Sequence, residues 1–204
     1  DEERFKFKPA KVIGNLAKGV KSVFKRVGFG ARQAMNAGLS LLRKMVITIS
    51  PLQCEETTCK SCLIFKVPKE NSFCVTMRFL KTDVAYLVVA GEVNQTPKFE
   101  KKIKLGDVPT CVNVGGRLGK ICLKSIEGHA ELISGQANIN FCLGVLIEKI
   151  NVGCKFCATY ANKKLKVRAK PQIFAGTTSD DGEIVQLDQN GDVKTLGAEE
   201  FEVD

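Results

Sequence analysis

Nine cysteines are the residues of this 204-residue chain whose types and spacing indicate the most definite chemistry. They are Cys54, Cys59, Cys62, Cys74, Cys111, Cys122, Cys142, Cys154 and Cys157. The chain has two Cys-x-x-Cys pairs, 59 with 62 and 154 with 157, which could offer four thiolates to a zinc ion. Such pairs normally lie closer together in sequence, and five further cysteines would have no role. We therefore expect disulfides made in an oxidising compartment, with eight cysteines paired, one left over and the connectivity open.

No other group of side chains predicts catalysis. His129 is the only histidine, and neither a nucleophile elbow nor a cluster of ligands lies near it in sequence, so we expect a structural role. Residues 115–120 look like a phosphate-binding loop. However, Val114 stands where that motif needs glycine, and Ile121 where serine or threonine would bind magnesium, so a tight turn is the better interpretation. We expect a protein that is not an enzyme and that has no cofactor and no metal.

Two further motifs lie in segments that we expect to be turns. Four oxygen-bearing side chains near the C-terminus have the spacing of a calcium loop, but Val193 stands where that loop needs glycine. We prefer a hairpin of residues 184–187 and 193–196 around the Asn-Gly pair at 190–191. Asn94 begins a candidate glycosylation sequon, which Pro97 makes less favourable. The four calcium-type side chains are Asp188, Asn190, Asp192 and Glu199.

Short strands separated by turn residues are predicted after Met45. Runs of β-branched and aromatic residues recur there, bounded by Gly, Pro or Asn. Residues 143–150 fit either a helix or a buried strand, because an apolar run this short does not show a decisive period. Regular short strands favour a sandwich or a barrel-like fold. The predicted strands are residues 46–49, 63–67, 74–79, 85–89, 102–105, 111–114 and 164–168.

A basic region with a helical period precedes these strands. Residues 5–54 contain ten Lys or Arg and no acidic residue. We expect two amphipathic helices, one beginning near Pro9 and one over about residues 31–45, with a hinge at residues 28–30. Gly38 is among the glycines that weaken these helices, so we expect them to become stable at an interface that covers their apolar face. That face contains Val12, Leu16, Val20, Val23, Val27 and Ala34.

This layout is typical of helices that lie on a negatively charged membrane surface. One alternative is a helix that covers a β core with a basic outer face, although such helices usually mix both charge signs. Nucleic-acid binding is another, but disulfide-rich secreted proteins rarely meet nucleic acid. Anionic lipid membranes are therefore the expected partner, and nucleic acid is not. The residues expected to contact lipid are Lys6, Lys8, Lys11, Val12, Leu16, Lys18, Val20, Lys21, Val23, Phe24, Lys25, Arg26, Val27 and Arg32.

The charge is unevenly distributed along a chain of globular composition. The net charge is +9, yet residues 171–204 carry a net charge of −8, so the two ends can attract each other. The longest uncharged run, residues 132–147, is too short and too polar to span a bilayer as a helix. We expect an α+β fold in which basic amphipathic helices precede a disulfide-stabilised, mainly antiparallel β domain. The predicted divisions are an acidic stub (1–4), a basic amphipathic region (5–50), a cysteine-rich β domain (51–175) and an acidic tail with a hairpin (176–204).

Several segments resemble the trialysin and redulysin family of lytic proteins from the saliva and venom of bugs. In that family an acidic pro-segment masks a basic lytic region until proteolysis releases it. For this chain the resemblance implies that a trypsin-like protease cuts between Arg4 and Phe5, and that Lys6 to Lys44 form the lytic region. The matching segments are residues 1–9, 49–52, 54–62, 86–92 and 126–130, which extend over essentially the whole chain.

The same resemblance assigns the odd cysteine. The family pattern has eight cysteines and none at the position of Cys154, which is therefore the expected free thiol. The expected disulfides join Cys54, Cys59, Cys62, Cys74, Cys111, Cys122, Cys142 and Cys157.

The resemblance and the basic region together predict a secreted, pore-forming cytolysin. We expect a salivary or venom gland product that acts at the membranes of target cells and microbes and that self-associates there. The start at Asp1 without a secretory signal fits a mature form. The alternative is a secreted, cystine-rich binding or inhibitor module whose basic arm contacts acidic partners.

Overall fold

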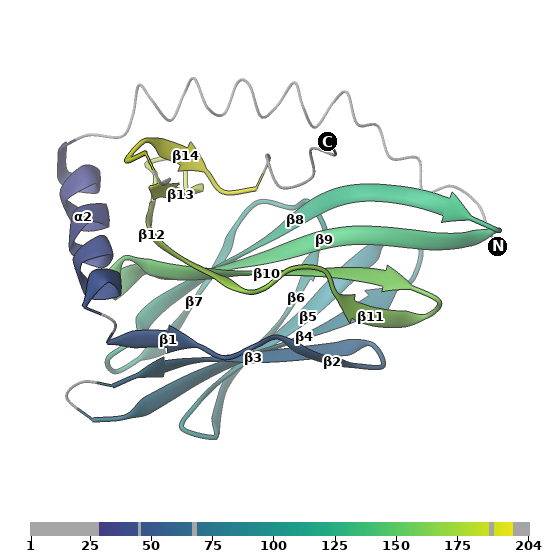
Figure 1. Cartoon of the computed structure of the whole chain (residues 1–204), viewed down its shortest axis with the longest axis horizontal. Helices are drawn as coiled ribbons and strands as arrows, with labels where there is room; N and C mark the ends of the chain where they lie inside the picture. Colours follow the sequence, from purple (N-terminus) through teal and green to yellow (C-terminus); the bar gives the residue numbers. More distant parts are fainter. Residues whose placement is uncertain (1–28, 45, 67–68, 188–189, 198–204) are drawn as a thin grey trace.

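The computed structural model describes residues 29–44, 46–66, 69–187 and 190–197, which form one α-helix followed by two sheets (Figure 1). The helix is α2 (Phe29–Arg43). The first sheet contains β1 (Ile47–Ile49), β2 (Gln53–Glu55), β3 (Thr58–Phe65), β4 (Asn71–Lys81), β5 (Ala85–Val93) and β6 (Thr96–Lys104). The second contains β7 (Thr110–Gly115), β8 (Gly119–Ile133), β9 (Gln136–Ile147), β10 (Val152–Ala161), β11 (Lys164–Val167), β12 (Gln172–Thr178), β13 (Ile184–Leu187) and β14 (Val193–Thr195). A 3-10 turn, η1 (Glu148–Ile150), connects β9 to β10.

Antiparallel pairing of neighbours in sequence accounts for most of the topology. The first sheet has the order β1-β3-β4-β5-β6, with β2 paired to β3, and the second has the order β14-β13-β12-β10-β9-β8-β7, with β11 paired to β10. Tight turns join many of these strands. At the β5–β6 turn Asn94 and Gln95 have φ values of 49° and 69°, the left-handed backbone that two-residue hairpins require.

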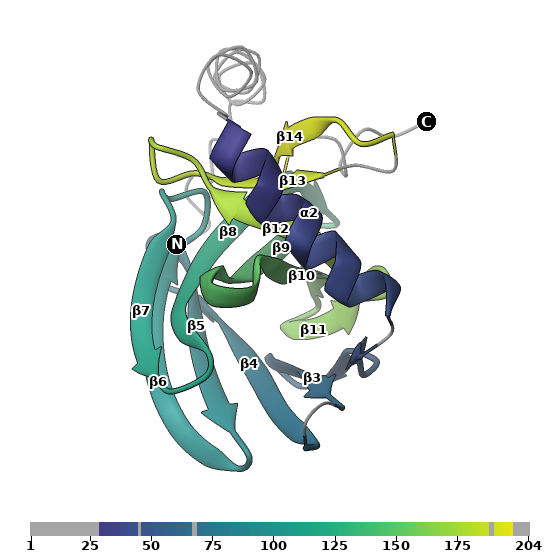
Figure 2. The same cartoon turned by 90° about the vertical axis from the view of Figure 1, so that its left-hand side faces the viewer.

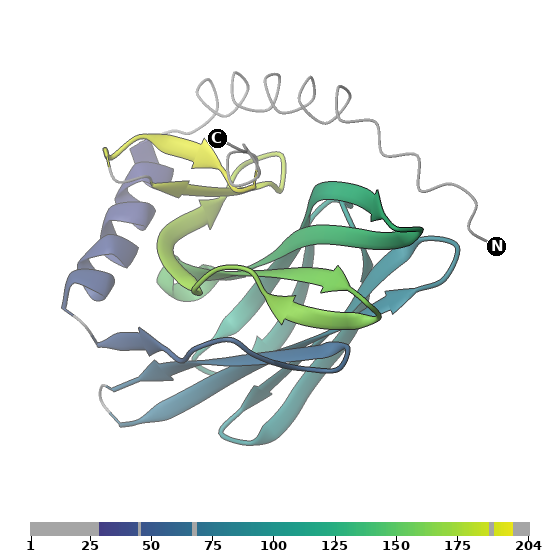
Figure 3. The same ribbon diagram turned by 45° about the vertical axis from the view of Figure 1, so that its right-hand side comes forward.

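The two sheets share one hydrophobic core. Along β5, Ala85, Leu87 and Val89 are buried while the residues that alternate with them are partly exposed, which is the pattern of a strand with one buried face. Phe79 of the first sheet stacks on Phe141 and Tyr160 of the second, with ring centroids 5.6 Å and 4.3 Å apart. Figure 3 shows the sheets as separate layers, and the main core lies between them.

The central strands of the second sheet are buried on both faces. One face of β9 and β10 adds to the main core, whereas Cys142 and Leu146 on the other face pack with Ile184 and Leu196 from the C-terminal hairpin. A strand covered on both sides has no alternation of apolar and polar residues. This explains why residues 143–150 were ambiguous from sequence: they form a strand as far as Ile147 and then η1.

The predicted mainly antiparallel, disulfide-containing fold with a preceding helix is confirmed. The seven predicted strands correspond to β1, β3, β4, β5, β6, β7 and β11, and the predicted C-terminal hairpin is β13 with β14. The described residues form one α-helix where two were predicted, because the first predicted helix falls on residues 1–28, outside the described part. Neither sheet closes on itself, so the sandwich or barrel is confirmed only as two open antiparallel sheets.

Candidate functional site

The apolar face of α2 lies against the β domain. Figure 2 shows the helix crossing the end of the second sheet, where it contacts β12 and β10. Met35 is fully buried and packs with Val185 and Val193 of the C-terminal hairpin. Leu41 and Leu42 pack against the main core. For residues 29–44, the interface that covers the apolar face is therefore supplied by the protein itself.

A glycine permits this close approach. A Cβ atom at Gly38 would overlap the carbonyl oxygen of Asn151, which directly follows η1. Glycine within a helix is about 1 kcal/mol less favourable than alanine. From the sequence, Gly38 was expected only to weaken the helix, and its role in docking was missed. No sequence signal identified Asn151 as its neighbour.

The start of α2 differs from the predicted hinge. The helix begins at Phe29, so Phe29 and Gly30 are helical, and it ends at Arg43 rather than at residue 45. The predicted hinge is therefore wrong at these two residues, and Gly28 lies outside the described part. The apolar contacts further along α2 outweigh the helix-weakening effect of Gly30.

The outer face of α2 is polar and becomes basic at its C-terminal end. Arg32, Arg43 and Lys44 are exposed, and cations in the last turn interact favourably with the helix dipole. Of the residues expected to contact lipid, Arg32 alone falls in the described part. The others are Lys6, Lys8, Lys11, Val12, Leu16, Lys18, Val20, Lys21, Val23, Phe24, Lys25, Arg26 and Val27, and they lie outside it together with Arg4 and Phe5.

Four disulfides fasten neighbouring strands. Each joins two cysteines that are direct partners in the strand register: β2 to β3, β3 to β4, β7 to β8, and β9 to β10. Each covalent bond thus restrains a pairing that hydrogen bonds already define, so strand register in both sheets is held twice. The pairs are Cys54–Cys59, Cys62–Cys74, Cys111–Cys122 and Cys142–Cys157.

Cys154 is the free cysteine. It lies on β10 between Val145 of β9 and Ile173 of β12, within the main core. Complete burial raises the pKa of its thiol, because a thiolate is poorly solvated there. A buried neutral thiol behaves as a small apolar side chain rather than as a nucleophile.

Asn94 is exposed at the β5–β6 turn, and its amide is engaged in hydrogen bonds. Its Oδ1 accepts from the Ser72 backbone N–H at 2.9 Å, and its Nδ2 donates to Asn71 Oδ1 at 2.9 Å. Nδ2 is the atom to which a glycan would be attached. Glycosylation at Asn94 therefore competes with part of a local network that holds this turn to β4.

The structure also locates the phosphate-loop-like segment, His129 and part of the calcium-like motif. Within the segment from Gly115 to Lys120, residues 116–118 form the tight turn that joins β7 to β8. His129 lies in β8, at the register shift between Glu127 and Ala130. Asp188 and Glu199 of the calcium-like motif lie outside the described part of the chain. Among the residues that are described, no cluster of His, Cys, Asp and Glu could hold a metal ion, and no helix combines the length and apolarity that a bilayer crossing requires.

The chain is similar over its whole length to named proteins. It is 58% identical over 209 residues to trialysin from Triatoma infestans, a match that covers 100% of this chain and 80% of that protein. It is 48% identical to venom redulysin 1 from Platymeris rhadamanthus, covering 94% of this chain and 31% of that longer protein. It is 31% identical to venom platylysin from Platymeris biguttatus, covering 90% and 89% of the two chains. No protein-family profile and no solved structure matches it.

Proposed function

This chain belongs to the trialysin and redulysin family, and we propose that it is a secreted cytolysin which permeabilises the membranes of cells and microbes without enzymatic chemistry. The observation that carries the proposal is the run from residue 5 to residue 54, with ten cationic side chains and no acidic one. Each Lys or Arg near an anionic membrane surface contributes about 1 kcal/mol of binding free energy. A run of this charge can therefore supply most of the attraction that brings the chain to lipid.

The docking of α2 supports a division of labour within the basic region. Because Met35, Leu41 and Leu42 contact the β domain, the apolar face of α2 is already covered. The apolar residues available to lipid are then those before α2, such as Val20, Val23 and Phe24. In this proposal residues 5–28 enter the membrane surface, and α2 connects them to a β domain stiffened by four disulfides.

Proteolysis is proposed to activate the protein. Arg4 directly precedes the basic run and follows three acidic residues, so cleavage by a trypsin-like protease after Arg4 would free it from them. Three carboxylates cannot neutralise ten cations. Strong masking therefore needs a longer acidic segment upstream, help from the C-terminal residues 171–204 with their net charge of −8, or both. Released chains then associate with one another in the membrane to form the lesion.

Dye release from lipid vesicles tests the proposal. The peptide 5–50 and the trypsin-treated chain should both release dye from anionic vesicles, and the peptide should gain helical circular dichroism on binding. High salt should weaken both effects, because exposed charges are screened beyond about 8 Å at physiological ionic strength. A precursor that retains its acidic segment should be less active, and N-terminal sequencing of the activated form should begin at Phe5. Intact vesicles under all these conditions would instead favour a secreted binding module.

A further inference from the structure

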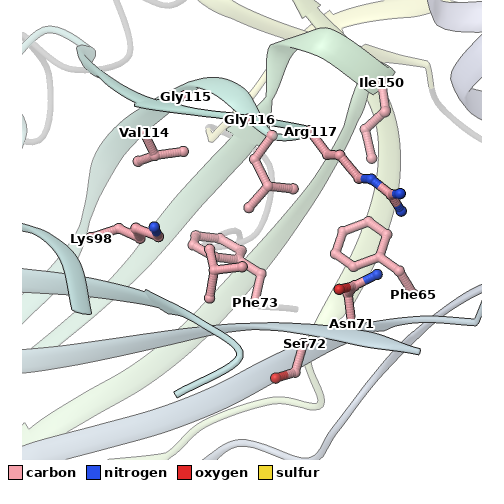
Figure 4. A pocket seen from close by; sticks show the side chains of 12 residues that line it. Phe65, Asn71, Ser72, Phe73, Lys98, Val114, Gly115, Gly116, Arg117 and Ile150 are labelled. Atoms are coloured by element: carbon pink, nitrogen blue, oxygen red, sulfur yellow. The ribbon is translucent and has the colours of Figure 1, made fainter. Parts of the chain in front are cut away.

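A cavity of about 330 Å³ lies between the two sheets, next to the turn that joins β7 to β8 (Figure 4). Its walls come from β3, β4, β5 and β6 of the first sheet and from the end of β7, the β7–β8 turn and η1 on the other side. Small-molecule sites in proteins have volumes of about 300–1,000 Å³, so this cavity has room for one small ligand. The apolar side chains that line it are Phe65, Phe73, Val93, Val114, Leu118 and Ile150.

The rim of the cavity is held in place by local bonds. Gly115 and Gly116 have φ values of 70° and 60°, a left-handed backbone that glycine adopts without strain. The Gly115 N–H donates to Asn113 Oδ1 at 2.9 Å, and Lys149 Nζ donates to the Gly116 carbonyl oxygen at 3.0 Å. The Cys111–Cys122 disulfide joins the two strands below the turn. These restraints keep the turn from collapsing onto the apolar floor.

Two cations and no acidic residue are among the described residues that line the cavity. Figure 4 shows Arg117 and Lys98 on opposite sides of the aromatic floor formed by Phe65 and Phe73. Both cations are exposed, and neither makes a hydrogen bond or an ion pair within the described part of the chain. An apolar chamber with unpaired positive charge at its edge is complementary to a ligand with an apolar tail and an anionic head.

We propose that this cavity binds one medium-chain fatty-acid anion, with its acyl chain on the apolar walls and its carboxylate at the edge near Arg117, while Lys98 adds positive charge on the opposite side. The volume suits one such chain and is at the low end for ligand sites, which disfavours the two chains of a phospholipid. The inference rests on the cavity and its charges and not on membrane lysis. In this proposal the β domain binds a lipid independently of the basic N-terminal region.

Isothermal titration of the full chain with octanoate, decanoate and dodecanoate, each below its micelle concentration, tests the proposal. We expect one site per chain, with affinity rising about fourfold for each added methylene, the equivalent of about 0.8 kcal/mol, until the cavity is full. Dodecanol, the neutral match, should bind more weakly than dodecanoate. Inorganic phosphate should not compete with it. Equal binding of the alcohol, competition by phosphate or independence of chain length would overturn the proposal.

Three variants locate the site. Arg117→Gln should weaken dodecanoate binding about two- to fivefold, as expected for an exposed ion pair, and leave dodecanol binding unchanged. Lys101→Gln, an exposed change on the same strand as Lys98 but outside the cavity, is the matched control. Val114→Trp should fill the cavity and abolish binding of both ligands, with thermal unfolding as the check on folding. Unchanged binding in Arg117→Gln, or in a folded Val114→Trp, would contradict the assignment.

The same titration separates this inference from the proposed lysis. Replacing Val20, Val23 and Phe24 by Ser removes apolar residues that the lytic proposal requires and leaves every described lining residue of the cavity unchanged. That variant should bind dodecanoate with unchanged affinity. If it loses both lysis and dodecanoate binding, the fatty acid is held by the basic N-terminal region, and the cavity assignment is wrong.

Discussion

The thiol of Cys154 is expected to be unreactive in the folded protein because of its position in the core. Its thiol is completely buried among apolar side chains, and burial raises its pKa, so the reactive thiolate is scarce. We expect the native protein not to react with a thiol reagent at neutral pH. The denatured, unreduced protein should react at one cysteine, which peptide mapping should place at Cys154. Label on another cysteine, or a disulfide-linked dimer, would contradict the four pairings described here.

Glu127 predicts a pH dependence of stability. Burial raises the pKa of this carboxyl above its ordinary value of 4.5, while nearby Lys104 acts in the opposite direction. The folded protein therefore binds this proton more tightly than the unfolded chain, and stability from this group declines as the pH rises from 4.5 through the folded pKa. Glu127→Gln removes this effect without a change of size.

Urea unfolding at several pH values measures the expected difference. The Glu127→Gln variant should be more stable than the parent at neutral pH, and its advantage should disappear below about pH 4.5. Glu100→Gln, which removes an exposed carboxylate from β6, is the control for a change in surface charge. A variant that is less stable at neutral pH would mean that attraction to Lys104 outweighs desolvation.

At the scale of elements, replacing each of two glycines of α2 by alanine is expected to change the stability of the protein in opposite directions. A Cβ atom at Gly38 meets the Asn151 carbonyl oxygen, so Gly38→Ala should force the helix away from η1 and destabilise the protein by about 1–3 kcal/mol. A Cβ atom at Gly30 meets no atom of the described residues within 4 Å, so Gly30→Ala should stabilise by up to about 1 kcal/mol through helix propensity. Urea unfolding followed by circular dichroism compares the two. Equal effects would mean that α2 does not dock as described.

Most strands with one exposed face were predictable from sequence, whereas the central strands covered on both faces were not. β4 and β5 show the alternation of half-buried strands, so their residues indicated them directly. β9 and β10 are apolar on both sides, because the C-terminal hairpin covers the face that the first sheet leaves open, and they were ambiguous or missed. The docking of α2 was not predictable either, since Met35 meets Val185 and Val193 from the far end of the chain.

On the scale of the whole molecule, a basic N-terminal region precedes a folded β domain, and residues 171–204 at the other end of the chain carry a net charge of −8. The charge run and the expectation that eight of the nine cysteines pair came from residue type alone, whereas the choice of Cys154 as the free thiol came from the family resemblance. The fatty-acid cavity was not visible in the sequence, because its walls come from strands of both sheets and from η1, which only the tertiary fold brings together. The central claim is that residues before α2, rather than α2 or the β domain, act on the membrane.

Dye release from anionic vesicles by a triple variant tests that claim most directly. Replacing Val20, Val23 and Phe24 by Ser should weaken membrane binding roughly a thousandfold or more, because each change loses about 1.5–3 kcal/mol of apolar burial. A matched control replaces three exposed residues of α2, Gln33, Asn36 and Ala37, by Ser. We predict that the first variant loses lysis with its β domain still folded, whereas the control lyses like the parent. Undiminished lysis by the first variant would contradict the account and move the active element elsewhere, with residues 132–147 the next to test.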